Sequence, residues 1–220
     1  SAEKKPNNKP YKDGVHYTGK EHSWDEAFGY WGAAAHQHGF NPNKVYEIAK
    51  MKNQGVADKN GDGMVDLKSE YVFGPCYYAA AFDRSGTKST NYTNTMFDAF
   101  LDGRKLITAA AGDALSDSER SQLKAYAATI EENWEKVLAE AVFKYAGSVY
   151  KDINKMKGLS GDDLNKAYRA YAKHWGELKG FAMAMQSGKS NLGATATKMN
   201  KLMGFGPVTL NNSYVTGMDS

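Results

Sequence analysis

A long amphipathic helix is the feature that most constrains how this chain folds. Ser116 and Glu119 have the spacing of a capping box, in which two side chains satisfy free backbone amides at the start of a helix. The residues that follow repeat apolar side chains every three or four positions: Leu123, Tyr126, Ile130, Trp134, Val137, Leu138, Ala141 and Tyr145. Because other helices must cover this stripe along its length, the sequence predicts a helical bundle.

Further helix starts follow the same rules. Thr18 and Glu21 form a second capping-box pattern, Asn41 precedes a proline that opens a short helix, and Ser160 precedes a long one. A last short helix is expected over 194–203. No stretch alternates apolar and polar residues as a half-buried strand does, so we expect an all-α protein built from antiparallel helical bundles.

The expected helical domain covers residues 17–205. Residues 1–16 are rich in Lys, Asn and Pro and contain little to bury, which predicts a solvated, linker-like tail. Residues 206–220 are expected to form an irregular C-terminal tail.

Composition and charge exclude several classes of protein. The formal net charge is only +3, and the Lys and Arg residues are interleaved with acids, so nucleic-acid binding is not expected. No run of 18 apolar residues could span a bilayer, and membrane association would need an anchor outside this sequence. The single cysteine, Cys76, excludes an intramolecular disulfide and is expected to be a buried apolar residue.

The segment DKNGDGMVDLKSE, residues 58–70, has the pattern of a calcium-binding loop. Such loops need oxygen ligands at positions 1, 3, 5, 7 and 9 and a glycine at position 6, which here is Gly63. Three aspartates within this short segment repel one another unless a cation neutralises them, which favours calcium over an Asx-rich surface turn. The predicted ligands are Asp58, Asn60, Asp62, the Met64 carbonyl, Asp66 and Glu70.

The end of this loop leaves two alternatives open. Position 12, which usually holds a bidentate acid, is Ser69, and the nearest acid is Glu70. Either the loop is one residue longer and Glu70 closes it, or the site is weaker. A single loop is expected to stabilise the fold and not to act as a sensor. Extracellular modules bind calcium with affinities of about 0.1 to 1 mM, so we expect a periplasmic, outer-membrane-associated or extracellular bacterial protein.

A Trp-x-Glu-x-x-Gly-aromatic pattern occurs twice, each time just after a histidine. The two copies are residues 24–30, after His22, and residues 175–181, after His174. On a helix, His22 shares a face with Asp25 and Glu26, and His174 shares one with Glu177. If the two helices face each other, these five side chains form a site for iron, manganese or zinc. The alternative, which the residues favour equally, is that these groups only make hydrogen bonds within the core.

The first copy lies in a stretch that resembles a known family. YTGKEHSWDEAFGYWG, residues 17–32, is similar to a stretch of bacterial surface or periplasmic proteins related to imelysin, a group also called insulin-cleaving proteases. The segments DGRKLI at 102–107, NWEKVLAEAVFKY at 133–145 and HWGELKGF at 174–181 are also similar. The resemblance covers approximately residues 17–185.

This resemblance implies an all-helical fold of two four-helix bundles, a Gly-x-His-x-x-Glu motif, a link to iron uptake and a peptidase label. By the resemblance, His22 is the motif histidine and Asp25 or Glu26 is its acid. The chain departs from the motif, since Glu21 stands in the Gly-x lead-in and Asp25 lies where the glutamate is expected. The second copy, His174-x-x-Glu177, keeps the spacing.

Together these features predict a calcium-stabilised protein that binds iron, or another metal such as zinc, or a small ligand in connection with uptake. The first alternative is a metal-dependent peptidase, in which a glutamate activates a metal-bound water. The second is a structural or adhesive surface module with no ligand besides calcium. The residues leave an enzymatic role open, and we favour binding.

Overall fold

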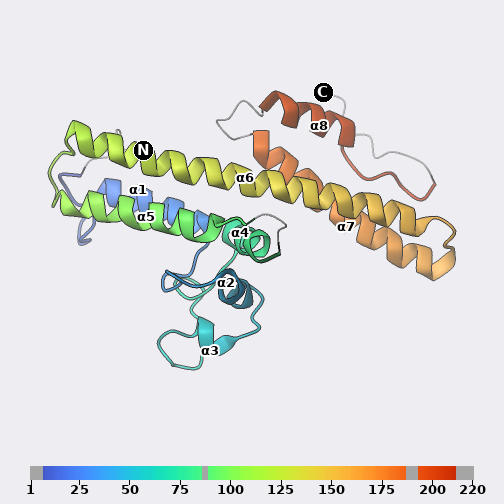
Figure 1. Ribbon diagram of the computed structural model, residues 1–220, viewed down its shortest axis with the longest axis horizontal. Helices are drawn as coiled ribbons and strands as arrows, with labels where there is room; N and C mark the ends of the chain where they lie inside the picture. Colours follow the sequence, from blue (N-terminus) through green and yellow to red (C-terminus); the bar gives the residue numbers. More distant parts are fainter. Residues whose placement is uncertain (1–6, 86–88, 187–192, 212–220) are drawn as a thin grey trace. The chain divides into compact units, whose positions relative to one another are not determined.

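The computed structural model describes residues 7–85, 89–186 and 193–211 (Figure 1). Over these ranges the chain is all-helical, with eight helices and, instead of a sheet, one isolated antiparallel bridge between Pro10 and Thr18. The all-α class is thus confirmed. None of the described helices combines the length and the apolar composition that crossing a bilayer requires.

The chain divides into two compact units, residues 1–137 and 138–220, where we expected one domain over 17–205. The boundary between them falls within a single long helix, α6, because its two parts pack against different helices. Each unit is therefore described by itself.

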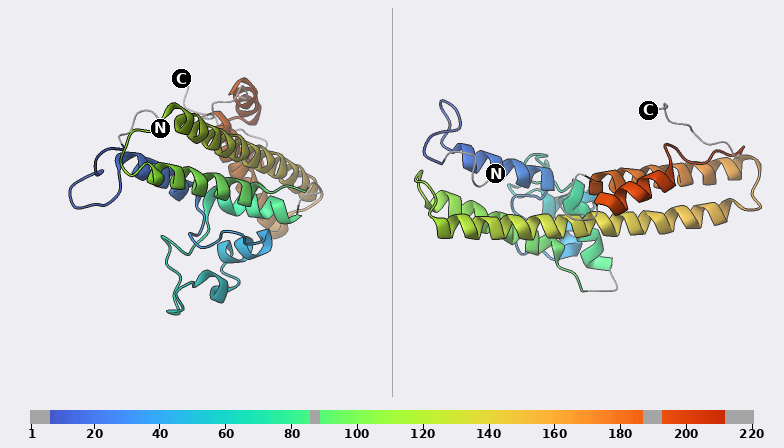
Figure 2. Two further views of the ribbon diagram at one scale, coloured as in Figure 1. Left: turned by 60° about the vertical axis from the view of Figure 1, so that its left-hand side comes forward. Right: turned by 90° about the horizontal axis from the view of Figure 1, so that it is seen from above.

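The first unit holds most of the helices. α1 packs against α5 and α4, and α4 packs in turn against α5 and α2. Figures 1 and 2 show α1 and α5 side by side, and Figure 1 shows α2 and α3 below α4. The helices of this unit are α1 (Gly19–Trp31), α2 (Pro42–Ala49), α3 (Gln54–Ala57), α4 (Gly74–Ser85), α5 (Tyr92–Ala109) and the first part of α6 (Asp117–Met156).

The predicted helix starts are present. The Thr18 hydroxyl accepts the Glu21 amide at 3.2 Å, and the Glu21 carboxylate accepts the Thr18 amide at 2.8 Å, so both halves of this capping box form. The same exchange joins Ser116 and Glu119 at the start of α6, with distances of 3.3 and 2.7 Å. Asn41 caps α2 through its side chain. These confirm the local signals that the sequence carries.

Aromatic and aliphatic side chains fill the core of the first unit. Trp31 at the end of α1 is fully buried, and its ring centroid lies 5.5 Å from that of Trp134 on α6. A second cluster joins Ile107, Leu115 and Leu123, with Trp24 packed against it. The amphipathic stripe of α6 is thus covered within this unit as its period predicts.

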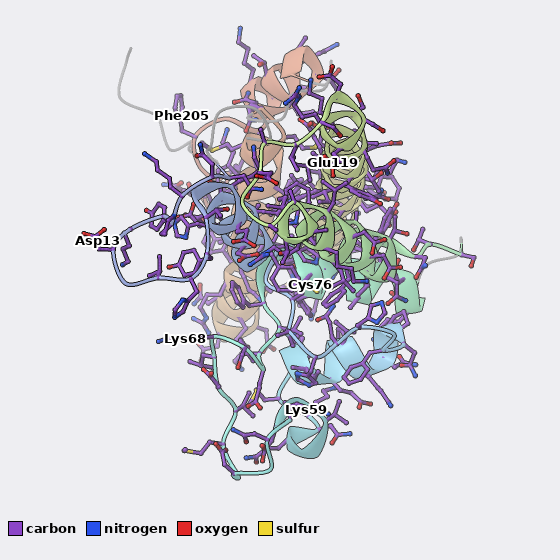
Figure 3. All side chains as sticks on the ribbon, turned by 90° about the vertical axis from the view of Figure 1, so that its left-hand side faces the viewer. Asp13, Lys59, Lys68, Cys76, Glu119 and Phe205 are labelled. Atoms are coloured by element: carbon purple, nitrogen blue, oxygen red, sulfur yellow. The ribbon has the colours of Figure 1, made fainter. Side chains whose placement is uncertain are left out.

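Cys76 lies among the helices of the first unit (Figure 3). Its side chain is fully buried, as expected, and burial raises the pKa of the thiol to about 12. The amide of Gln37 donates to its sulfur at 3.4 Å. A buried thiol that stays protonated is not a nucleophile, so Cys76 is a packing residue.

The second unit contains the rest of α6 together with α7 (Gly161–Gln186) and α8 (Gly193–Met203). Tyr145 of α6 stacks on Phe181 of α7 with ring centroids 5.7 Å apart. α8 packs against α7, where Lys179 donates to the backbone oxygen of Asn200 at 3.1 Å. The helix predicted after Ser160 and the short helix predicted over 194–203 are both present.

Residues 7–16, which were expected to belong to a linker-like tail, make contacts with the first unit. Asn7 is only 5% exposed, and its amide donates to the backbone oxygens of Ile107 and Asp113 at 3.3 and 3.1 Å. Thr18 donates to the Asn7 side chain at 2.8 Å. This segment therefore connects the start of α1 with the end of α5. Of the expected C-terminal tail, the structure describes residues 206–211, which form no helix.

Candidate functional site

The predicted calcium loop links α3 to α4, and its backbone is organised around Asp58. This residue follows α3 directly, and its carboxylate accepts the amides of Gly61, Asp62 and Gly63 at 2.7, 3.2 and 2.8 Å. Gly63 has a φ of +83°, a conformation that favours glycine, so position 6 of the loop makes the sharp turn that the pattern requires.

The next two predicted ligands continue this pattern. The Asn60 side-chain oxygen accepts the Asp62 amide at 3.0 Å, and an Asp62 oxygen accepts the Met64 amide at 2.8 Å. The Asn60 amide also donates to the second Asp62 oxygen at 2.8 Å. Polar side chains at alternate positions thus bend the loop by Asx-type hydrogen bonds.

The side chain of Glu70, and not that of Ser69, contacts both the first and the last part of the loop. Glu70 is 5% exposed, and one of its oxygens accepts the amides of Lys59 and Asn60 at 2.9 and 3.2 Å. The other oxygen accepts the amide of Asp66 at 3.0 Å. The Ser69 hydroxyl instead donates to the Asp66 carboxylate at 2.9 Å. Glu70 therefore joins the first and the last part of the loop through one buried carboxylate.

The donor atoms of the loop are of the kind that calcium uses, but their side chains do not converge on one point. Across the described residues, no three His, Cys, Asp or Glu side chains form a group that could hold a metal as they stand. In the loop the carboxylates are turned to backbone amides, and the Lys68 amide and Ser69 hydroxyl lower the pKa of Asp66. Calcium also uses amide and carbonyl oxygens, here those of Asn60 and Met64. The donors are thus of the right kind, and binding requires the side chains to turn toward a common centre.

The first histidine motif is engaged within α1 and with its neighbours. His22 lies 3.2 Å from the carboxylate of Glu26, and its ring stacks on Tyr11 with centroids 3.8 Å apart. Asp25 points elsewhere, since it accepts a hydrogen bond from Arg104 at 2.9 Å. Of the three predicted ligands on this helix, only His22 and Glu26 are in contact.

The second histidine motif has an acid partner that the sequence analysis missed. His174 on α7 lies 2.6 Å from the carboxylate of Asp152 on α6. One oxygen of Glu177 is buried and has no hydrogen-bond partner among the described residues. His22 and His174 belong to different units, so the convergence of the two motifs stays a prediction.

Arg104 on α5 holds together the acids of α1. One terminal nitrogen of its guanidinium donates to Glu21 at 2.6 Å and also bonds the Thr108 hydroxyl. Its Nε donates to Asp25 at 2.9 Å. The Thr108 hydroxyl donates to the same Glu21 oxygen at 2.9 Å. This role of Arg104 was not predicted, because nothing local marks an arginine whose partners lie on a distant helix.

A cavity of about 190 Å³ lies beside this network, in the first unit. Four aromatic side chains contribute to its lining: Trp24, Phe28, Phe97 and Phe100. Asp25 and Arg104 provide its charged groups, and the remainder is apolar. Sequence periodicity marks these aromatics only as core residues, and it does not show that they leave a space among them.

No protein-family model, no curated protein and no solved structure matches this chain. The relationship to imelysin therefore stays a prediction that rests on the motifs of residues 17–185.

Acid is expected to weaken the first unit through Glu21. Burial alone would raise the pKa of this carboxyl, but the Thr18 amide, Thr108 and Arg104 outweigh it and lower the pKa below 4.5. A lowered pKa means that Glu21 stabilises the fold above its unfolded-state pKa and that this contribution is lost as pH falls through the folded-state value. Burial raises the pKa of Asp25, so the ionisation of Asp25 changes stability in the direction opposite to that of Glu21.

Glu21→Gln should therefore reduce the free energy of unfolding by about 1 to 3 kcal/mol at pH 7 and by less below pH 4. Denaturant titrations over this pH range provide the measurement. Glu26→Gln, which changes an exposed acid of the same helix, is the control and should have little effect. Equal losses at pH 7 and pH 3 for Glu21→Gln would show that its ionisation contributes nothing.

Proposed function

We propose that this protein is a calcium-stabilised binding protein of the bacterial periplasm or cell surface. The observation that carries the proposal is the loop of residues 58–70, in which the buried Glu70 carboxylate accepts backbone amides from both ends. A loop already bent around Asp58 and joined by Glu70 needs only side-chain rotation to present several oxygens to one ion.

The charge of the loop supports calcium as the ion. Residues 58–70 contain four acids and two lysines, Lys59 and Lys68, so the segment carries a net charge of −2 (Figure 3). A divalent cation neutralises this charge and removes the repulsion among the carboxylates. Oxygen donors without histidine or cysteine favour calcium over zinc or iron at this place.

The position of the loop supports a stabilising role for the bound ion. It connects α3 to α4, and α2 packs against both of these helices. An ion that binds the folded loop and not the unfolded chain stabilises the folded state, and it would therefore hold this corner of the unit together. A single weak loop is saturated only where calcium is abundant, which supports a location outside the cytoplasm.

Calorimetric titration of metal-free protein with calcium tests this proposal. We expect one site per chain with a dissociation constant of about 0.1 to 1 mM, and weaker binding of magnesium, which demands stricter octahedral geometry. Asp58→Ala should abolish binding, whereas Asp13→Ala, at an exposed acid outside the loop, should leave it unchanged. Absence of calcium binding at about 10 mM, or equal binding by both variants, would refute the proposal.

The calcium loop does not identify the ligand that the protein binds. A transition-metal site of His22, Asp25, Glu26, His174 and Glu177 stays a prediction, and elemental analysis of protein purified without chelators is the measurement that tests it. The aromatic cavity of the first unit favours a small organic ligand instead, since cavities lined by apolar side chains with few polar groups are typical of such sites. The peptidase and adhesive roles have no observation in their favour.

A further inference from the structure

We propose that the aromatic cavity of the first unit binds an organic ammonium ion, such as a trimethylammonium head group. The proposal rests on four aromatic side chains and a partly accessible carboxylate, that of Asp25, around one space. It names a ligand class for the binding role proposed above, and it is independent of the calcium loop.

The aromatic rings around the cavity contact one another edge to face. Phe28 meets Phe97 and Phe100 with centroids 5.5 Å apart and interplanar angles of 83° and 79°. Trp24 meets Phe100 at 6.0 Å and 69°. Ring faces carry partial negative charge and attract cations, and quaternary ammonium groups are bound in proteins by such sets of rings.

One ring is held in place by its own hydrogen bond. The indole nitrogen of Trp24 donates to the backbone oxygen of Phe100 at 2.8 Å, which fixes α1 to α5 beside the cavity. A ligand thus meets a wall that is already formed, so little side-chain ordering opposes binding.

The charges beside the cavity also favour a cation. Asp25 and Arg104 line the cavity, and Arg104 also pairs with Glu21 behind it, so these three ionised groups sum to −1. The guanidinium uses two of its nitrogens on these acids, so its charge is already paired. In contrast, the contacts of Asp25 with described residues use only Oδ1, and its side chain is 51% exposed. A ligand cation can therefore approach the second oxygen.

The size of the cavity limits the ligand. Its volume of about 190 Å³ is several times what one water molecule needs. This space admits a head group of four or five heavy atoms, for example a quaternary ammonium group, with the rest of the ligand extending into solvent.

The test compares three molecules of nearly the same shape and different charge. Choline is the cation, 3,3-dimethyl-1-butanol is the neutral analogue, and 3,3-dimethylbutanoate is the anion. Calorimetry and saturation-transfer NMR of the methyl protons measure binding to the full chain. We expect choline to bind about tenfold more tightly than the alcohol, and the anion to bind most weakly. Equal binding of all three, tighter binding of the anion, or no binding of choline would overturn the proposal.

Two pairs of variants locate the binding. Asp25→Asn should weaken choline binding about tenfold and leave alcohol binding unchanged, while Asp13→Asn should change neither. Phe28→Leu keeps an apolar side chain but removes a ring and should weaken choline binding, whereas Tyr30→Leu, at a 76% exposed ring of the same helix, should not. Thermal melts identify any variant that fails to fold. If Phe28→Leu is such a variant, the test depends on Asp25→Asn, which keeps the shape of the side chain. Choline binding that survives Asp25→Asn unchanged would refute this site, and a failed calcium titration would refute only the loop.

Discussion

Replacing Gly103 with alanine is expected to destabilise the first unit by about 2 kcal/mol, although alanine is the better helix former by about 1 kcal/mol. A Cβ at Gly103 would lie 2.1 Å from the indole ring of Trp24, which is far inside van der Waals contact. The ring must therefore move, and its hydrogen bond to the Phe100 oxygen is lost. Denaturant titration gives the free energy of unfolding that checks this result.

Gly29→Ala is the matched control for this variant. Gly29 lies in α1, the helix that carries Trp24, and the described residues place nothing within 4 Å of a Cβ there. This substitution should raise the free energy of unfolding by about 0.5 to 1 kcal/mol. In the double variant Trp24→Leu/Gly103→Ala the glycine should matter much less, because the clashing ring is gone. Similar effects of Gly103→Ala and Gly29→Ala would contradict the close contact.

Glu70→Ala is expected to have the second large effect, with a loss of about 2 to 3 kcal/mol in the absence of calcium. The variant leaves three backbone amides, those of Lys59, Asn60 and Asp66, without their buried acceptor. If the loop binds calcium as proposed, its affinity should also fall by more than tenfold. Denaturant titration with and without calcium separates the two losses.

Ser69→Ala separates the two alternatives for the end of the loop. Among the described residues the Ser69 hydroxyl bonds only the exposed Asp66 carboxylate, so its removal should cost less than about 0.5 kcal/mol and leave calcium affinity nearly unchanged. A larger loss of affinity in Ser69→Ala than in Glu70→Ala would assign position 12 of the loop to the serine and refute the role given to Glu70.

The helices of this protein were predictable from the sequence because their signals are local. The capping boxes at Thr18 and Ser116 join residues three positions apart, and the apolar period of α6 depends on that helix alone. α7 begins directly after Ser160 as predicted, and α8 begins within one residue of its predicted start. The glycines of the duplicated motif show the limit of such local signals, since a Cβ at Gly29 or Gly180 would meet no described atom within 4 Å and neither glycine serves a close approach.

The candidate sites were predictable only in part. The turns of residues 58–70 were recognisable, since the side chains that bend them lie close together in sequence. The hydrogen bonds of Glu70 to both ends of this segment needed the fold, and calcium binding there stays a prediction. The carboxylate of Asp152 was missed as the partner of His174, because the two residues are 22 positions apart on different helices. Whether two such residues meet depends on how the chain turns and how the helices pack, and the residues near the histidine do not predict either.

The sequence alone determined the all-α class and the helix starts, since each depends on interactions between residues a few positions apart. Only the tertiary structure decided that Arg104 bonds Glu21 and Asp25, from 83 and 79 positions away, and that four aromatic residues surround a space. The physical reason is that a hydrogen bond between distant residues, or a cavity among rings, exists only after the helices have packed. Two helices with the same apolar periods could pack without either feature.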